Sequence, residues 1–370
     1  MKAAGAAAAE LVFIPFPVMG HLVSTVEMAK QLIGRDHRLS ITVLIMKIPF
    51  DISKVSSSTQ SPLLTAAEDR LKFVYLPQEE AASAELRPKN PVNFMLEFVN
   101  MNKQHVRDHV TKIISTDSSR LAGFVVDMFC TPMMDVAAEF GLPTYVFVTS
   151  SCAFLGFKLH LDTLSRDQDI TELKNSDAEL EVPVFVNPVP AKVLPEGGST
   201  FFVSVAKRLR ETKGIMVNTF EELESYAVKR LAGDDKVPPI YPVGPVLHLV
   251  MDEKEGNEEV IQIMRWLDNQ PPSSVVFLCF GSMGTFDGDQ MDYRRDVLYD
   301  SFKAKLVTVD EIENGIRKLM ENGDKSSIEG IKQKVKEMSE KSKIVIKEGG
   351  SSYNYIGRFI EDVIINVSSP

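Results

Sequence analysis

The chain has 370 residues, of which 44% are hydrophobic and 25% are charged, and its formal net charge is −10. This length predicts two domains, and the composition is ordinary for a globular protein. The acidic balance argues against nucleic acid or an anionic membrane surface as a main partner. No stretch reaches the roughly 18 to 20 uninterrupted apolar residues of a membrane span, so no stable membrane insertion is expected.

The N-terminus and the cysteines indicate the cellular compartment of the protein. The start of the chain is rich in alanine, but Glu10 interrupts the apolar run, which is atypical of a signal peptide. Cys130, Cys152 and Cys279 are widely spaced in apolar surroundings, a pattern that indicates buried thiols in a reducing compartment. We therefore expect a cytoplasmic protein.

Short apolar segments alternate with amphipathic ones through most of the chain. The predicted strands are Leu11–Pro15, Ser40–Met46, Leu71–Leu76, Leu121–Val126, Thr144–Thr149, Gly214–Asn218 and Ile240–Val243. The predicted helices are Gly20–Ile33, Pro91–Ser115, Thr131–Phe140, Ser151–Leu164 and Glu221–Ala232, and the proline-rich segment Glu181–Gly198 is predicted as a loop. This alternation favours an α/β fold with a parallel, doubly wound sheet over residues 1–246.

The remainder of the chain does not supply a second complete sheet. We predict a linker at 247–257 and a second domain over 258–370, which opens with the helix Glu258–Asp268 and the apolar strand Ser274–Ser282. After Gln290 the sequence is charged and helical. Its predicted helices run from the capping box Thr308–Glu311 to Asn322, over Ser327–Ser342, and from Gly349 to Ile365. A lone parallel strand needs neighbours on both edges and cover on both faces, so we expect an incomplete domain.

Two polar residues follow strands that a doubly wound sheet places side by side. His21 comes just after the first strand and Asp127 ends the fourth. Open parallel sheets bind ligands beyond the carboxyl ends of their strands, where the strand order reverses. A histidine oriented by a carboxylate can act as a general base, so this pair is a candidate catalytic dyad. The alternative is structural, with His21 as a polar residue at a helix start and Asp127 as a helix cap.

Other residues near the same strand ends are candidates for lining a substrate pocket. They are Phe16, Met19, Phe129, Thr149 and Phe154. The alternative is that the aromatic residues among them belong to the upper core of the domain, which is the usual place for an aromatic side chain beside a strand.

Two further patterns are weaker. Gly281, Ser282 and Met283 follow a predicted strand and can present backbone N–H groups to a phosphate, although a simple turn explains them equally well. His105 and His109 are one helical turn apart, but no third ligand is visible, so the sequence favours a solvated pair over a metal site.

Several motifs occur in order along the chain. They lie at Phe13–Leu22, Val125–Cys130, Thr212–Phe220, Pro239–Pro245 and Trp266–Ser282. Together they resemble the motifs of the plant family 1 UDP-sugar glycosyltransferases over residues 10–288. The resemblance resumes at Met291–Arg295 and includes Gly349–Ser352 in the tail.

The resemblance implies a GT-B arrangement of two facing Rossmann-like domains. The first domain would bind a small lipophilic acceptor with a hydroxyl group, such as a phenolic or terpenoid, and the second a UDP-sugar as co-substrate. His21 would be the catalytic base of an inverting transfer and Asp127 its partner. Ser282 would contact the nucleotide phosphates. No separate cofactor is expected.

The chain departs from the family in the donor-binding signature. Its Trp-Ala-Pro-Gln start, its His-Cys-Gly-Trp-Asn-Ser core and its acidic-Gln end are all absent, and Trp266 is the only tryptophan. The sequence passes directly from Gln290 to Met291, two points that flank most of the donor domain in the family, so the chain resembles an internally deleted member. We therefore expect UDP-sugar binding and transfer to be lost or severely impaired. The alternative function is a non-catalytic protein that binds acceptors or dimerises. A smaller departure is Val184, where the family usually has glycine.

Overall fold

The structure is a computed structural model that describes residues 9–47, 70–77, 91–116, 120–167, 169–194, 199–247, 258–271, 274–277, 308–320 and 325–368. The chain divides into two compact units. One combines Met1–Leu247 with Lys341–Pro370, and the other is His248–Glu340.

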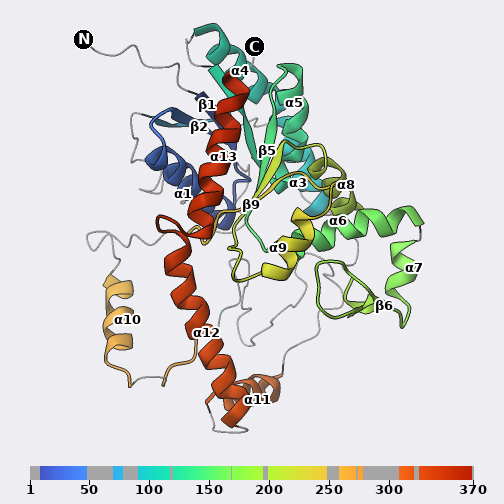
Figure 1. Cartoon of the computed structure of the whole chain (residues 1–370), viewed down its shortest axis with the longest axis vertical. Coiled ribbons are helices and arrows are strands. Elements are labelled where there is room, and N and C mark those ends of the chain that lie inside the picture. Colours follow the sequence, from blue (N-terminus) through green and yellow to red (C-terminus); the bar gives the residue numbers. More distant parts are fainter. Residues whose placement is uncertain are drawn as a thin grey trace. The chain divides into compact units, whose positions relative to one another are not determined.

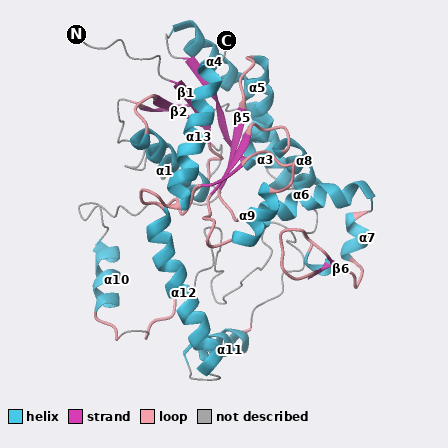
Figure 2. Cartoon of the chain, viewed as in Figure 1, coloured by secondary structure: helices cyan, strands magenta, loops and turns pink. Residues whose placement is uncertain are grey.

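A seven-stranded parallel sheet forms the centre of the first unit (Figure 1 and Figure 2). Its strands are β1 (Ala9–Ile14), β2 (Leu39–Ile45), β3 (Leu71–Tyr75), β4 (Arg120–Asp127), β5 (Thr144–Val148), β8 (Gly214–Val217) and β9 (Ile240–Pro242). They lie in the order β3-β2-β1-β4-β5-β8-β9, so the chain order reverses where β1 pairs with β4. The parallel doubly wound sheet and the adjacency of its first and fourth strands were both predicted, and both are confirmed.

The central strands are apolar because helices cover both faces of the sheet. Every residue of β1, β5 and β8 is buried, as near-continuous hydrophobic strands of parallel sheets are. The helices of this unit are α1 (Met19–Arg35), α3 (Pro91–Met101), α4 (Lys103–Thr116), α5 (Met134–Glu139), α6 (Cys152–Asp167), α7 (Ile170–Lys174), α8 (Ser199–Leu209), α9 (Ser225–Ala232) and α13 (Ser351–Ser368), with short 3-10 turns at η3 (Met128–Met133) and η4 (Ala191–Val193).

Three local predictions differ from the structure. The helix predicted over Pro91–Ser115 is two helices, α3 and α4, with Asn102 between them; the Asn102 side chain donates to the Phe98 carbonyl oxygen and so competes with the continuing backbone ladder. The helix α8 was not predicted at all. The proline-rich loop contains a two-stranded hairpin, β6 (Glu179–Leu180) with β7 (Val189–Pro190).

The last helix, α13, belongs to the first unit, which differs from its predicted place in a domain over 258–370. It packs against β1, β4 and β9 and buries one face. The buried side chains are Ile356, Phe359, Ile360 and Val363, at helical spacing. The ring of Phe359 lies 5.0 Å from that of Tyr145 and 5.5 Å from that of Tyr241. The sheet therefore takes part of its apolar cover from this last helix.

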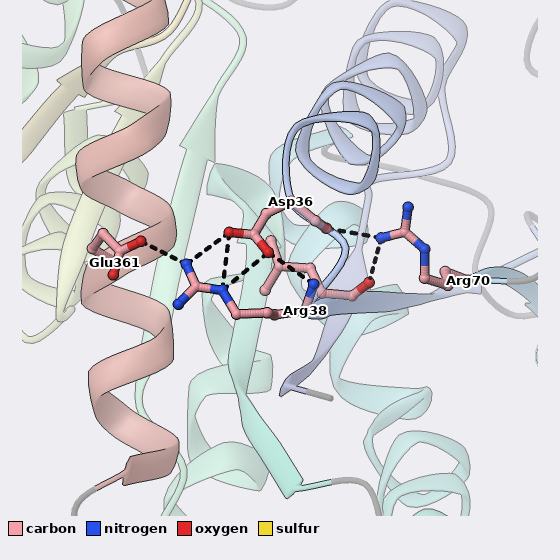
Figure 3. Close-up of polar contacts among 5 residues, drawn as sticks. Asp36, Arg38, Arg70 and Glu361 are labelled. Atoms are coloured by element: carbon pink, nitrogen blue, oxygen red, sulfur yellow. Dashed lines mark hydrogen bonds and ion pairs between the residues drawn. The ribbon is translucent and has the colours of Figure 1, made fainter. Parts of the chain in front are cut away.

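Polar contacts fix α13 beside the start of β2. Arg38 donates to Asp36 at 2.7 Å and to Glu361 of α13 at 2.6 Å, so one guanidinium joins both carboxylates (Figure 3). Arg70 donates to the Asp36 carbonyl oxygen at 2.8 Å. The hydrogen bond from Arg38 lowers the pKa of Asp36 despite the opposing effect of burial. Because these pairs are partly exposed, each contributes little to stability.

The second unit contains α10 (Glu258–Asp268), α11 (Val309–Met320) and the larger part of α12 (Lys325–Val345). The predicted capping box is confirmed. The Glu311 N–H donates to the Thr308 hydroxyl at 3.2 Å, and the Thr308 N–H donates to the Glu311 carboxylate at 2.9 Å.

The strand predicted at Ser274–Ser282 is not borne out over 274–277, which are described and take no strand conformation. No strand in the described part of the chain pairs with these residues, and an unpaired strand has no ladder to fix it. The remaining residues of that prediction lie outside those that the structure describes. Among the described helices, none is both long and apolar enough to cross a bilayer.

Candidate active site

Three neighbouring strands, β1, β4 and β5, end at one edge of the sheet. His21 lies in the first turn of α1, which follows β1. Asp127 is the last residue of β4, and Thr149 comes directly after β5. Because parallel strands bring their carboxyl ends to a common edge, these three side chains converge, although more than 100 residues separate His21 from either of the others.

His21 and Asp127 are in direct contact. The imidazole Nδ1 lies 2.6 Å from Asp127 Oδ2 and 3.2 Å from the hydroxyl of Thr149. A carboxylate only accepts hydrogen bonds, so Nδ1–H donates to Asp127 and a neutral His21 keeps its lone pair on Nε2. The predicted proximity of the two side chains is confirmed.

Asp127 also serves as a helix cap. Its Oδ1 accepts the backbone N–H of Phe129 at 2.8 Å at the start of η3, while Oδ2 holds the imidazole. In the sequence analysis, a helix cap and a catalytic dyad were alternative roles for Asp127. The structure allows both, because one carboxylate oxygen caps the turn and the other contacts the imidazole. Its side chain is fully buried, whereas the His21 side chain keeps 21% of its surface exposed. The base can therefore be reached and its partner is rigid.

Opposing effects set the pKa of His21. Burial lowers it, but the charge of Asp127 and the hydrogen bond to it together raise it by more, so the pKa lies above its ordinary value. The positive charge of Lys158 acts against this rise. A raised pKa makes Nε2 more basic, which suits a group that takes a proton from a hydroxyl.

Aromatic rings surround this pair, and we call them the aromatic wall. Its members are Phe16, Phe98, Phe129, Phe154, Phe201 and Phe202. The ring of Phe129 lies 5.2 Å from the imidazole, and that of Phe16 lies 6.3 Å from it. Phe129 stacks on Phe201 of α8 at 5.8 Å, with an interplanar angle of 17°. This cluster places apolar aromatic rings next to a polar base.

The predicted pocket residues occupy different places. Phe16 and Phe129 lie against the imidazole, whereas Phe154 lies further along the wall, 5.8 Å from Phe202. Thr149 contacts Nδ1 of His21, on the same nitrogen as Asp127. Met19 opens α1 with 38% of its surface exposed, so it is not packed into the wall.

Sequence reasoning missed four residues of this region, namely Phe98, Phe201, Phe202 and Lys158. Phe201 and Phe202 belong to α8, whose apolar residues recur at helical spacing through Val205 and Leu209; that periodicity was the available signal. Nothing in the sequence distinguished Lys158 from an exposed lysine.

The predicted donor residues Gly281, Ser282 and Met283 lie outside the described residues. His105 and His109 do not form a metal site with any described neighbour, because no group of three ligand side chains occurs within the described ranges.

Known proteins resemble this chain in sequence. It is 50% identical to UDP-glucose flavonoid 3-O-glucosyltransferase 6 of Fragaria ananassa over 301 residues, which cover 77% of the chain and 61% of that protein. It is 37% identical to UDP-glycosyltransferase 71E1 of Stevia rebaudiana over 483 aligned positions, which cover 96% of the chain and 98% of the relative. The chain belongs to the plant UDP-glycosyltransferase family.

Solved structures of this family agree with the fold. A UDP-glycosyltransferase of Siraitia grosvenorii in complex with UDP superposes with a TM-score of 0.78 at 30% identity, over 96% of this chain and 100% of that one. UGT71G1 of Medicago truncatula complexed with UDP-glucose gives a TM-score of 0.78 at 29% identity, over 96% and 98% of the two chains. The expected GT-B-like α/β class is confirmed. No protein-family model matches the chain.

Lengths differ between the chain and its relatives. The chain spans 61% of the length of the strawberry UDP-glycosyltransferase that it matches at 50% identity. The alignment with the Stevia relative has 483 positions, more than the 370 residues of the chain, so that alignment carries gaps on the side of this chain.

Proposed function

We propose that this chain is a UDP-glycosyltransferase homologue that keeps the acceptor site of the family and has lost, or nearly lost, sugar transfer. The observation that carries the first half is the contact of 2.6 Å between His21 Nδ1 and Asp127 Oδ2, with aromatic rings beside the imidazole. The ligand is a small, lipophilic alcohol or phenol. Its hydroxyl lies at Nε2 and its apolar body lies on the aromatic wall.

In the intact reaction, His21 Nε2 removes the proton of the acceptor hydroxyl. The oxygen attacks the anomeric carbon of the UDP-sugar, the new C–O bond forms as the bond to UDP breaks, and the configuration inverts. Asp127 holds the proton-bearing Nδ1 and stabilises the imidazolium that results. UDP leaves with its added negative charge, which the donor domain must neutralise. The first unit supplies the base and the acceptor surface.

The missing donor motif supports the second half of the proposal. The sequence has no His-Cys-Gly-Trp-Asn-Ser core, its one tryptophan is Trp266, and the alignment with the Stevia relative is longer than the chain, as an internal deletion would make it. The one donor-side motif that the sequence keeps, Gly281–Met283, is too little to hold a nucleotide sugar better than about millimolar, because ~4 kcal/mol of binding already needs several good contacts. Positioning of the donor and stabilisation of the leaving group are lost together.

This proposal assigns a role to each segment of the chain. Residues 1–246 form the acceptor domain, 247–257 the linker and the segment from 258 the reduced donor side, with the last helix returned to the acceptor domain. The buried, unpaired thiols of Cys130 and Cys152 support a reducing compartment such as the cytoplasm.

Calorimetry with UDP-glucose, and separately with a panel of simple phenols, tests both halves. We expect phenol binding that His21→Ala weakens and no UDP-glucose binding below the millimolar range. A product assay with both ligands should show no transfer. The exposed His37 provides the control variant, since His37→Ala leaves the site intact.

Two results would overturn the proposal. If UDP-glucose binds at micromolar concentration, or if sugar transfer is observed and His21→Ala abolishes it, the chain is an active enzyme. If no phenol binds, the acceptor half of the proposal is wrong.

A further inference from the structure

A cavity of about 470 Å³ lies in the first unit, between the strands β1, β2 and β3 and the helix α4. Its polar lining comes from Glu10, Thr42, Lys72, His109 and Lys112. Glu10 is the second residue of β1, whereas the catalytic candidates follow the carboxyl ends of their strands. The cavity is therefore separate from the candidate active site.

Two buried polar side chains form the inner end of this cavity. The covered face of a parallel sheet is usually apolar, but here Glu10 is only 4% exposed and Thr42 only 2%. The Thr42 hydroxyl donates to Glu10 Oε1 at 2.7 Å. A hydroxyl has one proton to donate, and an ionised carboxylate only accepts. The inner end therefore presents hydrogen-bond acceptors, and it favours a ligand group that donates, such as a hydroxyl.

Two exposed lysines form the rim of the cavity. Lys72 pairs with Thr42 across β2 and β3, so both side chains leave the sheet on the same face. Lys112 lies on α4, one helical turn after His109. Burial, and then the charge of Lys112, lower the pKa of His109, so its imidazole is neutral at pH 7. Two positive charges therefore face one carboxylate, that of Glu10.

We propose that this cavity is a second binding site of the chain, and that its ligand is a small aliphatic hydroxy acid. The hydroxyl groups of the ligand donate to Glu10 and to the Thr42 oxygen, and its carboxylate lies at Lys72 and Lys112. A single negative charge on the ligand balances the excess positive charge of the lining. The inference does not depend on the proposed function, because neither His21 nor the aromatic wall lines this cavity.

Three ligands with the same length of carbon chain separate the two ends of the proposed site. Gluconate has hydroxyl groups and a carboxylate, sorbitol has the hydroxyl groups without the charge, and hexanoate has the charge without the hydroxyl groups. NMR titration of the full chain, observed at the imidazole protons of His109, reports binding; His109→Gln assigns the signals. We expect gluconate to bind roughly tenfold more tightly than sorbitol or hexanoate, because only gluconate engages both the buried acceptors and the lysines.

Substitutions at the two ends should change the affinities differently. With Lys72→Met and Lys112→Met together, the affinity for gluconate should fall to that for sorbitol, which should itself stay unchanged. Thr42→Val keeps the shape of the side chain and removes the hydroxyl oxygen, so it should weaken gluconate and sorbitol but not hexanoate. Lys229→Met, at an exposed position on α9, is the control and should change none of the three affinities.

Two results would overturn this inference. If gluconate binds no more tightly than sorbitol and hexanoate, or binds without shifting the His109 signals, the cavity is not a hydroxy-acid site. If the double lysine variant keeps the preference for gluconate over sorbitol, the lysines do not hold the carboxylate. Thermal unfolding shows whether each variant keeps its fold, and gluconate should raise the Tm of the unmodified protein. Binding of phenols beside His21 is measured separately, so its failure would leave this inference standing.

Discussion

Replacing Asp127 by asparagine should lower the pKa of His21 from above its ordinary value to below it. Burial alone lowers this pKa, and only the charge and the hydrogen bond of Asp127 overcome that effect. The Asp127 side chain has no exposed surface and the contact is 2.6 Å, so solvent screens it little. A hydrogen bond between charged groups contributes about 1.5–3 kcal/mol. The imidazolium form of His21 loses roughly that stabilisation in Asp127→Asn, and the pKa of His21 falls accordingly.

Titration of the imidazole Cε1 protons by NMR measures this shift without requiring any activity. The exposed His37 serves as an internal reference in the same spectra. Asp135→Asn is the matched control, since Asp135 lies half exposed on α5 and pairs with Lys103 and Arg208 rather than with the imidazole. A His21 pKa that stays constant or rises in Asp127→Asn would refute the electrostatic reasoning.

The same pair should make stability depend on pH in a defined direction. The folded-state pKa of His21 is raised above the unfolded value of about 6.5. Its contribution is therefore fully present below the unfolded-state pKa and is lost as the pH rises through the folded-state pKa. The difference in unfolding free energy between the unmodified protein and Asp127→Asn should shrink over that window in urea titrations. A difference that grows with pH there would contradict the assignment.

Three other substitutions probe the packing. Lys158→Met should raise the unfolding free energy by on the order of a few kcal/mol near neutral pH, because it removes a buried ammonium whose folded-state pKa is lowered to about 7. This gain in stability should decrease as the pH rises above that value. A destabilised variant would show that the amine has a stabilising partner. Gly156→Ala should destabilise the fold by about 1–3 kcal/mol, since the added methyl would lie 2.3 Å from a methyl of Val184. In chemical denaturation, Val184→Gly should restore the lost stability. If Gly156→Ala has the same effect with Val184 and with Gly at position 184, this clash is excluded. Phe359→Ala should lower the unfolding free energy by about 3–5 kcal/mol in thermal or urea unfolding, because it leaves a cavity between α13 and the sheet. A loss below about 1 kcal/mol would mean that the helix is not part of that core.

Hydrophobic patterning by itself determined the sheet. The seven strands of the central sheet are short, apolar and separated by amphipathic segments, so their positions follow from local sequence to within two residues. The adjacency of the first and fourth strands follows from the usual strand order of doubly wound sheets. Once β1 and β4 are neighbours, the meeting of His21 with Asp127 is a consequence of topology. That part of the site could be predicted because it depends only on where the strands end and on which strands are neighbours.

The tertiary structure decided the features that depend on contacts between distant segments. Local sequence cannot say that α13 returns to cover the sheet, because its apolar face is equally suited to any partner. It cannot say that Phe201 and Phe202 of α8 pack against the other rings of the aromatic wall, since the sequence of a helix does not show which surface its aromatic residues will contact. The burial of Lys158 is likewise invisible in the sequence, where a lysine on an amphipathic helix is expected to face water. Periodicity fixes which residues share a face, whereas only the packing of whole elements fixes what that face meets.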